Sequence, residues 1–325
     1  MADSILILAE HLKGEVSDIT YEMLGAGRRL ADERGVPLRV LLAGGDVASL
    51  ASRLGLADEV LVASAPALEV PAASTLAALI KSLMEQESAG LVLLGGTNAT
   101  MGVGSILSAR TELPFASYCK DVRVDGADML VTSQLFGGKI LTDVRLPGGR
   151  GIVSVYPGSF PADAGRSDKA PPVRKVEVPL EPSPVAFKTF IEPPAGDVDI
   201  TKQSILVAVG RGIQTQDNIA LGEELAELLG GAVCGSRPVI DQGWLPLTRQ
   251  VGKSGMTVKP RLYLALGISG APEHQEGMKD SPMIIAINTD PGAPIFDIAK
   301  YGAVMDLFEL VEPLKAAIQA KKAGA

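Results

Sequence analysis

Short apolar runs alternate with amphipathic segments along the first third of the chain. Nearly continuous hydrophobic runs of this kind are typical of strands in a parallel sheet that helices cover on both faces. Between the first two runs, Ile19, Met23, Ala26 and Leu30 share one helical stripe, and Gly35 follows as a helix stop. The pattern predicts βαβ units with four strands, at residues 4–9, 37–43, 59–63 and 91–94.

The helical period disappears between residues 115 and 156. Three dipeptides separate short apolar runs there: Asp125-Gly126, Gly137-Gly138 and Gly148-Gly149. Such dipeptides favour tight turns between antiparallel strands. We therefore expect β-hairpins added to the first sheet, with apolar positions at Val122, Val124, Leu130, Val131, Leu135, Ile140, Val144, Ile152 and Val153.

Proline is concentrated between residues 157 and 194, which hold nine of the 22 prolines. Because proline lacks a backbone N–H, this density excludes a helix and favours a linker or an edge strand. Alternation at Val176 and Val178 and at Val185 and Phe187 allows a short hairpin. We place the domain boundary near residues 195–199, which gives an N-terminal domain over 1–195 and a C-terminal domain over 196–325.

The alternation of strands and helices resumes after this boundary. Strands are predicted at residues 204–209, 232–234, 261–266, 283–287 and 303–305, and helices at 217–229 and 295–301. Residues 313–322 predict a charged amphipathic helix that can pack on either domain. The fold class is therefore α/β with two domains: an N-terminal parallel-sheet domain with added β-hairpins and a C-terminal doubly wound, Rossmann-like domain.

Charge and composition narrow the function classes. The chain has 30 Lys and Arg against 38 Asp and Glu, a net charge of −8, which argues against nucleic acid as a partner. No apolar run approaches the ~18 residues of a membrane span, and no secretory or transit peptide is visible. We expect a protein that is not membrane-embedded, in a prokaryotic cytoplasm. Cys119 and Cys234 lack metal-type spacing and are expected to be reduced and structural.

The ends of the C-terminal strands carry the candidate chemistry. Ligands of doubly wound sheets bind beyond the carboxyl ends of the strands, where glycine allows close backbone approach and arginine meets phosphate or an aromatic ring. Plain turn chemistry explains any one of these ends, but together they suit a dinucleotide. The residues at these strand ends are Gly210-Arg211-Gly212, Gly235-Ser236-Arg237, Gly267-Ile268-Ser269-Gly270, Asn288-Thr289-Asp290 and Asp306.

Familiar catalytic and phosphate motifs are absent. The GxGxxG pattern that starts at Gly210 fails because Thr215 occupies the third glycine position. The P-loop pattern that ends at residues 252–254 fails because Leu247 occupies its first glycine position. No GxSxG or HExxH motif occurs. Of the two histidines, His11 is interpreted as a surface or capping residue, whereas His274 follows a strand-end loop at the proposed crevice.

Several motifs in order and at matching spacing closely resemble the alpha subunit of electron-transfer flavoprotein. The resemblance also covers the first domain. The motifs are residues 6–11, 91–97, 136–139, 156–161, 210–212, 235–244, 250–255, 267–271, 277–281 and 286–296, together with His274.

This resemblance implies a non-covalent FAD in the second domain and a separate beta subunit that completes a heterodimer. Such a protein carries electrons and has no catalytic residues of its own. It accepts electrons from flavin dehydrogenases, such as acyl-CoA dehydrogenases, and passes them to a quinone reductase or another redox acceptor. Whether the beta subunit carries AMP or a second FAD stays open.

The family pattern also implies residue roles. Arg237 would lie over the isoalloxazine ring, and Ser254 and Ser269 would hydrogen-bond the flavin or its ribityl chain. His274 would face the flavin N1/O2 edge as a cationic donor that raises the potential. The remaining expected FAD contacts, which include the pyrophosphate and adenosine contacts, are Arg211, Ser236, Gln250, Val251, Gly267, Ile268, Gly270, Glu273, Asn288, Asp290 and Asp306.

The sequence departs from the family pattern at three positions. Glu273 stands where glutamine is common, Val209 where glycine is common, and Ser254 where threonine is common. An ionised Glu273 lacks an N–H donor, which would lower the potential, although its charge would keep His274 protonated.

Two other functions stay open at this point. A bifurcating electron-transfer flavoprotein would need a second redox flavin, and a nucleotide-dependent α/β enzyme would need an acid/base set that the sequence does not display. A scaffold subunit that has lost its cofactor is a weaker alternative, because the strand-end set is intact.

Overall fold

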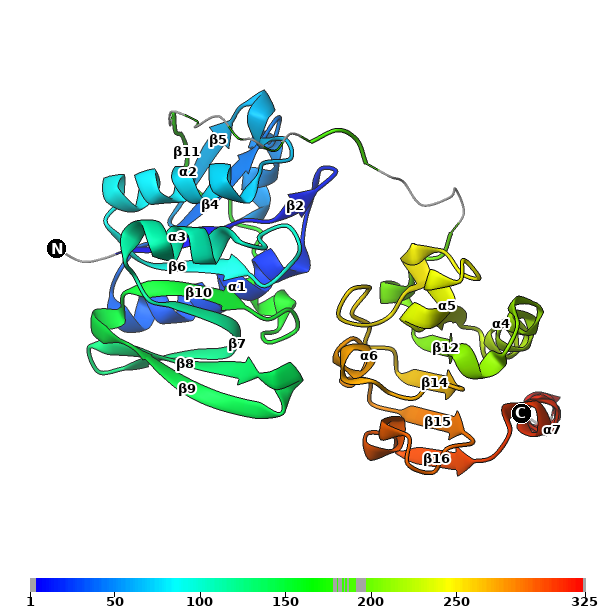
Figure 1. Cartoon of the computed structure of the whole chain (residues 1–325). Coiled ribbons are helices and arrows are strands. Elements are labelled where there is room, and N and C mark those ends of the chain that lie inside the picture. The colour runs from blue at the N-terminus through cyan, green and yellow to red at the C-terminus, as the bar shows by residue number, and fades with distance from the viewer. Residues whose placement is uncertain are drawn as a thin grey trace. The chain divides into compact units, whose positions relative to one another are not determined.

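The computed structural model describes residues 4–177, 180, 183, 185, 187–190 and 197–323. The chain divides into two compact units, residues 1–189 and 190–325 (Figure 1). The predicted boundary at 195–199 falls partly outside the described residues, as does Val178 of the possible hairpin. Among the described residues, no helix is long and apolar enough to cross a membrane.

The first unit is built on a mixed sheet of nine described strands. Their order is β11-β5-β4-β1-β6-β10-β7-β8-β9, and only the β7–β8 and β8–β9 pairs are antiparallel. The strands are β1 (Ser4–Leu8), β4 (Leu38–Gly44), β5 (Glu59–Ser64), β6 (Ala89–Gly95), β7 (Phe115–Asp125), β8 (Asp128–Leu135), β9 (Ile140–Leu146), β10 (Gly151–Val155) and β11 (Val173–Lys175). The short strands β2 (His11–Leu12) and β3 (Glu15–Val16) form a separate pair.

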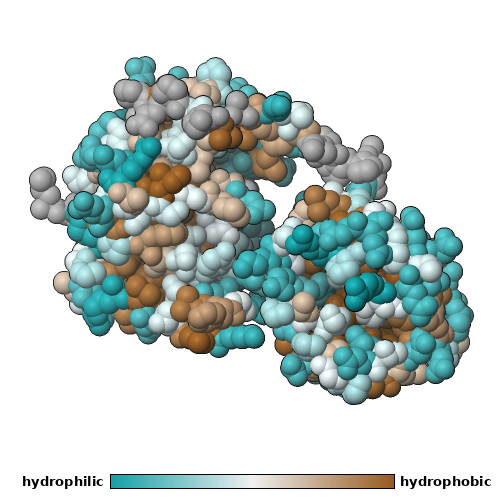
Figure 2. Space-filling view, in the orientation of Figure 1, coloured by the Kyte–Doolittle hydropathy of each residue, from teal (hydrophilic) through white to brown (hydrophobic). Residues whose placement is uncertain are grey.

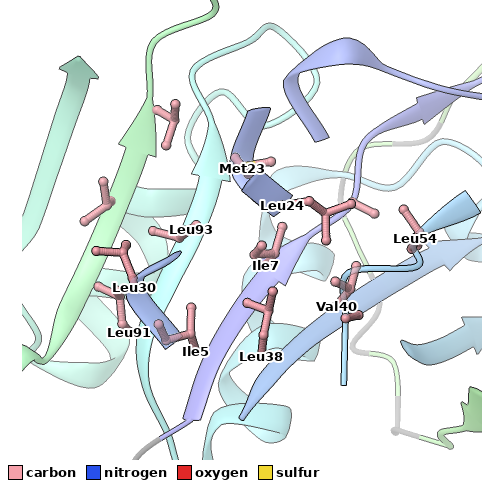
Figure 3. Close-up of a cluster of buried hydrophobic side chains, with 14 of the residues drawn as sticks. Ile5, Ile7, Met23, Leu24, Leu30, Leu38, Val40, Leu54, Leu91 and Leu93 are labelled. Carbon is pink, nitrogen blue, oxygen red and sulfur yellow. The ribbon is translucent and has the colours of Figure 1, made fainter. Parts of the chain in front are cut away.

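Helices cover both faces of this sheet: α1 (Asp18–Arg34), α2 (Ala73–Gln86) and α3 (Val103–Thr111). Ile5 and Ile7 of β1 pack in the cluster that contains Met23 and Leu30 of α1 (Figure 3). The alternate β1 residues, represented by Leu6, pack in the cluster that includes residues of α2 and α3. Burial on both faces explains the continuous apolar runs, and the four predicted strands and the helix that ends at Gly35 are confirmed.

The predicted hairpins are confirmed at Asp125-Gly126 and Gly137-Gly138, but the one at Gly148-Gly149 is wrong. After β9 the chain crosses back, and β10 lies parallel between β6 and β7. Ile152 and Val153 are both fully buried, so this strand needs helices on both faces, as a central parallel strand has and an edge hairpin lacks. Arg34 of α1 donates to the Gly148 carbonyl oxygen at 3.2 Å and supports the return.

The proline-rich stretch contains the edge strand β11, as predicted, together with one 3-10 turn at Ala162–Gly165. Arg174 of β11 donates to Glu59 at 2.9 Å and to Glu87 at 2.7 Å, and Arg39 lies 3.2 Å from Glu87. This group of two arginines and two glutamates ties the edge strand to β4, β5 and the end of α2.

The second unit is a five-stranded parallel sheet in the order β13-β12-β14-β15-β16. Its elements are β12 (Ile205–Val209), α4 (Ile219–Leu229), β13 (Ala232–Gly235), α5 (Arg237–Asp241), β14 (Leu262–Leu266), α6 (Pro272–Glu276), β15 (Ile284–Asn288), β16 (Tyr301–Val304) and α7 (Leu307–Ala323). The two-domain α/β fold class is thus confirmed.

Three predicted elements of the second unit need correction. The helix at 295–301 is only a 3-10 turn at Pro294–Asp297, and the last strand begins at Tyr301, where the helix was expected to end. Helix α7 begins at Leu307 instead of residue 313 and packs on the second unit, where Leu307 and Val311 join the cluster that contains Leu225 of α4.

Near the start of the second unit, Asp197 forms an ion pair with Arg249. Arg249 Nε lies 2.6 Å from Asp197 Oδ1 and Nη1 donates to the Val233 carbonyl oxygen at 2.8 Å, while Thr248 donates to the other Asp197 oxygen. Burial alone would raise the pKa of Asp197, but Thr248 and Arg249 together hold it below its usual value. We call this group the Asp197–Arg249 clamp.

Candidate functional site

The strand order of the second unit places a crevice between β12 and β14. The chain leaves β12 toward β13 on one side, and β14 lies on the other side, so the connections diverge at the carboxyl ends of these two strands. Divergence of this kind marks the ligand site of doubly wound sheets.

Glycines allow the two loops at this point to touch. Gly210 N–H donates to the Leu266 carbonyl oxygen at 2.8 Å, and Gly212 N–H to that of Gly267 at 3.1 Å. A Cβ on Gly210 would lie 2.3 Å from the Gly267 carbonyl oxygen, which no side chain tolerates. The glycine pattern after these strands is therefore a packing requirement that brings backbone to backbone.

A loop at residues 250–256 forms a second wall. Val251 N–H donates to the Gly235 carbonyl oxygen at 3.0 Å, which pairs the loop with the end of β13. Gln250 is buried and donates from Nε2 to Ser254 Oγ at 2.9 Å. Lys253 N–H donates to the Glu273 carbonyl oxygen at 2.7 Å, which joins this loop to the short helix α6.

These walls enclose a cavity of about 870 Å³, within the usual range of ligand sites. Thirteen of the fifteen predicted site residues line it: Arg211, Ser236, Arg237, Gln250, Val251, Ser254, Gly267, Ile268, Ser269, Gly270, Glu273, His274 and Asn288. Residues from four strand ends and α6 thus meet at one place.

Asp290 and Asp306 do not line this cavity. An Asp290 carboxylate oxygen accepts from the Gly292 N–H at 2.8 Å, and one of Asp306 accepts from the Phe308 N–H at 3.0 Å. These bonds stabilise the turn after β15 and the start of α7, as short carboxylates do at turns and helix starts. The structure therefore gives both residues local roles.

The sequence reasoning left six lining residues out of the predicted set. Four of them are glycines or small apolar residues that offer backbone, and two, Asp241 and Lys253, are charged. The six are Gly212, Pro238, Asp241, Gly252, Lys253 and Ala271. All six lie inside the quoted motif ranges, so those ranges already indicated this part of the cavity.

The surroundings of His274 favour the neutral ring, whereas the family pattern led us to expect a cationic donor. The residue is 7% exposed, and its Nε2 lies 2.9 Å from the hydroxyl of Tyr263. Burial lowers the pKa of His274 to about 4, which the backbone of Val251 only partly offsets. Glu273 is exposed on α6, so solvent screens its carboxylate from the ring.

Arg237 is an accessible cation at the cavity. Its side chain is 69% exposed, and its Nε lies 3.4 Å from Asp241 one turn along α5. An exposed pair of this kind contributes little stability, so the guanidinium can leave Asp241 for a ligand at small cost.

The comparisons with known proteins agree with this geometry. Residues 199–279 match the family described as the electron transfer flavoprotein FAD-binding domain, and residues 5–181 match the electron transfer flavoprotein domain. Protein FixB of Clostridium saccharobutylicum is 38% identical over 98% of this chain and 96% of its own length. The electron transfer flavoprotein subunit alpha of Methylophilus methylotrophus is 35% identical over 97% and 99%.

The chain belongs to the electron transfer flavoprotein alpha subunit family. A further relative is subunit LctC of the lactate dehydrogenase (NAD(+),ferredoxin) of Acetobacterium woodii, which is 31% identical over 97% of this chain and 77% of that subunit. FAD as the cofactor is confirmed by the family model, and membership implies a beta subunit as the partner in a heterodimer.

The cavity residues of this alpha subunit fit FAD. Hydroxyl, amide and guanidinium groups from four strand ends suit a pyrophosphate and ribityl chain, and the glycine loops let backbone N–H groups approach it. Gly252, at φ +138°, and Gly270, at φ +80°, shape the wall beside α6. The buried Nδ1 of His274 makes no well-formed hydrogen bond among the described residues, with the Val251 backbone as a weak acceptor, so a ligand group can still pair there.

Proposed function

We propose that this alpha subunit holds FAD against the thirteen cavity residues and works as an electron carrier with no substrate chemistry of its own. The observation that supports this most is the convergence of those residues on one cavity beyond the strand ends. Bound FAD supplies the redox chemistry. The chain binds and orients it: Arg237 covers the ring, and Ser254, Ser269 and His274 provide polar contacts.

The charged groups at the cavity favour a carrier over an enzyme. Asp241 and Glu273 are exposed, and the histidine is buried and neutral, so the described lining offers no buried acid/base pair. We infer that electrons arrive from flavin dehydrogenases, such as acyl-CoA dehydrogenases, and leave to a quinone reductase or another redox acceptor. We also infer a location in a prokaryotic cytoplasm, in agreement with two free, buried cysteines.

The test is a flavin measurement on the chain co-purified with its beta subunit. We expect a flavin spectrum, release of FAD on denaturation, and reduction of the bound flavin by a dehydrogenase with its substrate. Colourless protein that does not take up added FAD would refute the proposal. Turnover of a substrate by the heterodimer alone would refute the carrier function while leaving FAD binding intact.

A bifurcating function is the second candidate, because one relative is a subunit of a lactate dehydrogenase named for both NAD(+) and ferredoxin. Bifurcation needs a second redox flavin. One FAD per heterodimer favours simple transfer, and two redox-active flavins with coupled reduction of two acceptors favour bifurcation.

We further propose that the first unit binds the beta subunit through the apolar end of the β8–β9 hairpin. Phe136 is 74% exposed, and Leu135, Ile140 and Leu141 beside it are also exposed. Hydrophobic side chains gather on the lower part of this unit in Figure 2. Exposed apolar patches commonly mark interfaces. Replacing Phe136 and Leu141 by serine should reduce co-purification of the beta subunit, whereas serine at Val173, on the opposite edge of the sheet, should not.

A further inference from the structure

A buried chain of three polar side chains leads from the core to the cavity wall. Tyr263 lies on β14, the central strand of the second sheet, and its side chain is fully buried. Its hydroxyl lies 2.9 Å from Nε2 of His274, and the thiol of Cys234, on β13, lies 4.0 Å from the hydroxyl oxygen. A buried tyrosine hydroxyl needs a partner, and His274 is the strong one.

The chemistry of the three groups sets the direction of the hydrogen bonds between them. A thiol is a weak donor and a weak acceptor. The Tyr263 hydroxyl therefore donates its hydrogen bond to the imidazole nitrogen and not to the sulfur. Burial raises the pKa of Tyr263 well above its usual value and that of Cys234 to about 12, so both keep their protons at neutral pH. With Tyr263 as donor, Nε2 of His274 is the acceptor, and the hydrogen of the neutral ring lies on Nδ1.

The other side of the ring agrees with this orientation. Nδ1 is buried and makes no well-formed hydrogen bond among the described residues, although the ring lines the cavity and the Val251 backbone acts on the ring as a weak acceptor. An N–H in that position keeps donor capacity that a ligand acceptor would use. Donation from Tyr263 into Nε2 also polarises the ring and strengthens the Nδ1–H donor.

We propose that Tyr263 is a positioning residue that fixes the orientation of His274 and keeps the imidazole hydrogen on Nδ1, so that His274 presents one donor to FAD. The part that concerns FAD rests on the proposed function. The part that concerns the tautomer does not, because it follows from contacts within the chain.

The first experiment is nitrogen NMR of the full chain with its beta subunit, labelled at histidine. The chain has two histidines, so His274→Gln assigns the signals. We expect His274 with the hydrogen on Nδ1 before FAD is added, and a mixture of tautomers in Tyr263→Phe. A wild-type ring with the hydrogen on Nε2, or an unchanged ring in Tyr263→Phe, overturns the proposal. The wild-type spectrum decides even if Tyr263→Phe fails to fold.

The second experiment is a double-mutant cycle on the flavin midpoint potential. We expect Tyr263→Phe to lower the potential in the same direction as His274→Ala and by a smaller amount. In the His274→Ala background the same change should have no further effect, because Tyr263 acts through the histidine. Equal shifts in both backgrounds overturn the proposal. Tyr21→Phe, a buried tyrosine of the first unit, is the matched control and should leave the potential unchanged.

The two experiments separate the possible failures. Protein that never binds FAD refutes the proposed function, while the NMR result still tests Tyr263. Cys234→Ala removes only the weak thiol contact of Tyr263, so this variant should keep the Nδ1–H tautomer. Loss of that tautomer in Cys234→Ala would assign the positioning role to the thiol and overturn the assignment to Tyr263.

Discussion

The two units use the same strand arrangement at their centres and differ in what occupies the strand ends. In the first unit the connections diverge between β1 and β6, and in the second between β12 and β14. Beyond β1 and β6 lies the buried carboxylate of Glu10, which accepts from the Thr97 hydroxyl at 2.7 Å and from that of Thr100 at 3.3 Å. Beyond β12 and β14 lies the 870 Å³ cavity. A protein side chain fills one crevice, and the other can receive a ligand.

This difference rests on a few loop residues. A Cβ on Gly95 would lie 2.1 Å from a Glu10 carboxylate oxygen, whereas a Cβ on Gly210 would meet the Gly267 backbone. Glycine thus makes room for a carboxylate in one unit and for a second loop in the other. Topology selects the place for a ligand site, and the loops decide whether a site exists there.

The largest expected effect comes from closing the second crevice. Gly210→Ala forces the β12 and β14 loops apart, so we expect FAD binding to be lost and the unfolding free energy to fall by about 1–3 kcal/mol. The matched control is Gly95→Ala, whose new methyl group meets the end of a side chain in the first unit. It should destabilise that unit and leave FAD affinity unchanged, as titration followed by flavin fluorescence measures. Equal loss of FAD in both variants would contradict the comparison.

The second prediction is an opposite pH response of the two units. Burial lowers the pKa of His274 from 6.5 to about 4, so its contribution to stability is present above pH 6.5 and is lost as the pH falls toward 4, by about 3 kcal/mol. Burial raises the pKa of Glu10, against the opposing effects of Thr97 and Thr100. Its contribution is therefore present at low pH and is lost as the pH rises through the folded-state value.

Hydrogen exchange resolved for each unit measures this response. His274→Gln should remove part of the acid sensitivity of the second unit, and Glu10→Gln should remove part of the loss of stability that the first unit shows as the pH rises. The comparison fails if both substitutions change the pH profile in the same direction.

The third prediction concerns arginines. Arg174 in the first unit is shared by Glu59 and Glu87, whereas among the described residues Arg237 at the cavity pairs with Asp241 alone. Arg237→Ala should weaken FAD binding by about 0.5–2 kcal/mol, roughly 2–30-fold, and Arg237→Lys by less, since lysine keeps the charge without the planar stack. Calorimetric titration measures this. Arg261→Ala, outside the cavity lining, is the control, and wild-type affinity in Arg237→Ala would remove this residue from the site.

The smallest expected effect is on the flavin potential. A neutral His274 donor contributes about 0.5–1.5 kcal/mol, so His274→Ala should lower the midpoint potential by roughly 20–65 mV. Glu273→Gln should change it less, because Glu273 is exposed. Spectroelectrochemical titration measures both. A larger shift in Glu273→Gln would make the carboxylate the main influence on the flavin.

Strand ends were the most predictable part of the molecule, because apolar runs that end in glycine or a small polar residue have a local signature. The surroundings of individual side chains and the pairing of distant strands were not predictable. The lowered pKa of His274 depends on its burial in the folded unit, and its contact with Tyr263 depends on a residue that the sequence shows only as one more core position in an apolar strand. The insertion of β10 between β6 and β7 depends on pairing with strands that are distant in sequence. The Gly148-Gly149 dipeptide predicts a turn and does not predict which strand pairs after it. Asp290 and Asp306 were assigned by position, although their carboxylates stabilise local turns.

The Asp197–Arg249 clamp sets a practical limit for dissecting the molecule. Arg249 directly precedes Gln250 in the cavity wall, and its partner Asp197 lies two residues before the start of the FAD-binding family match at residue 199. An excised flavin fragment that began at residue 199 would leave a largely buried guanidinium without its carboxylate, next to the flavin loop. Fragments and fusions should keep Asp197 on the flavin side of the cut.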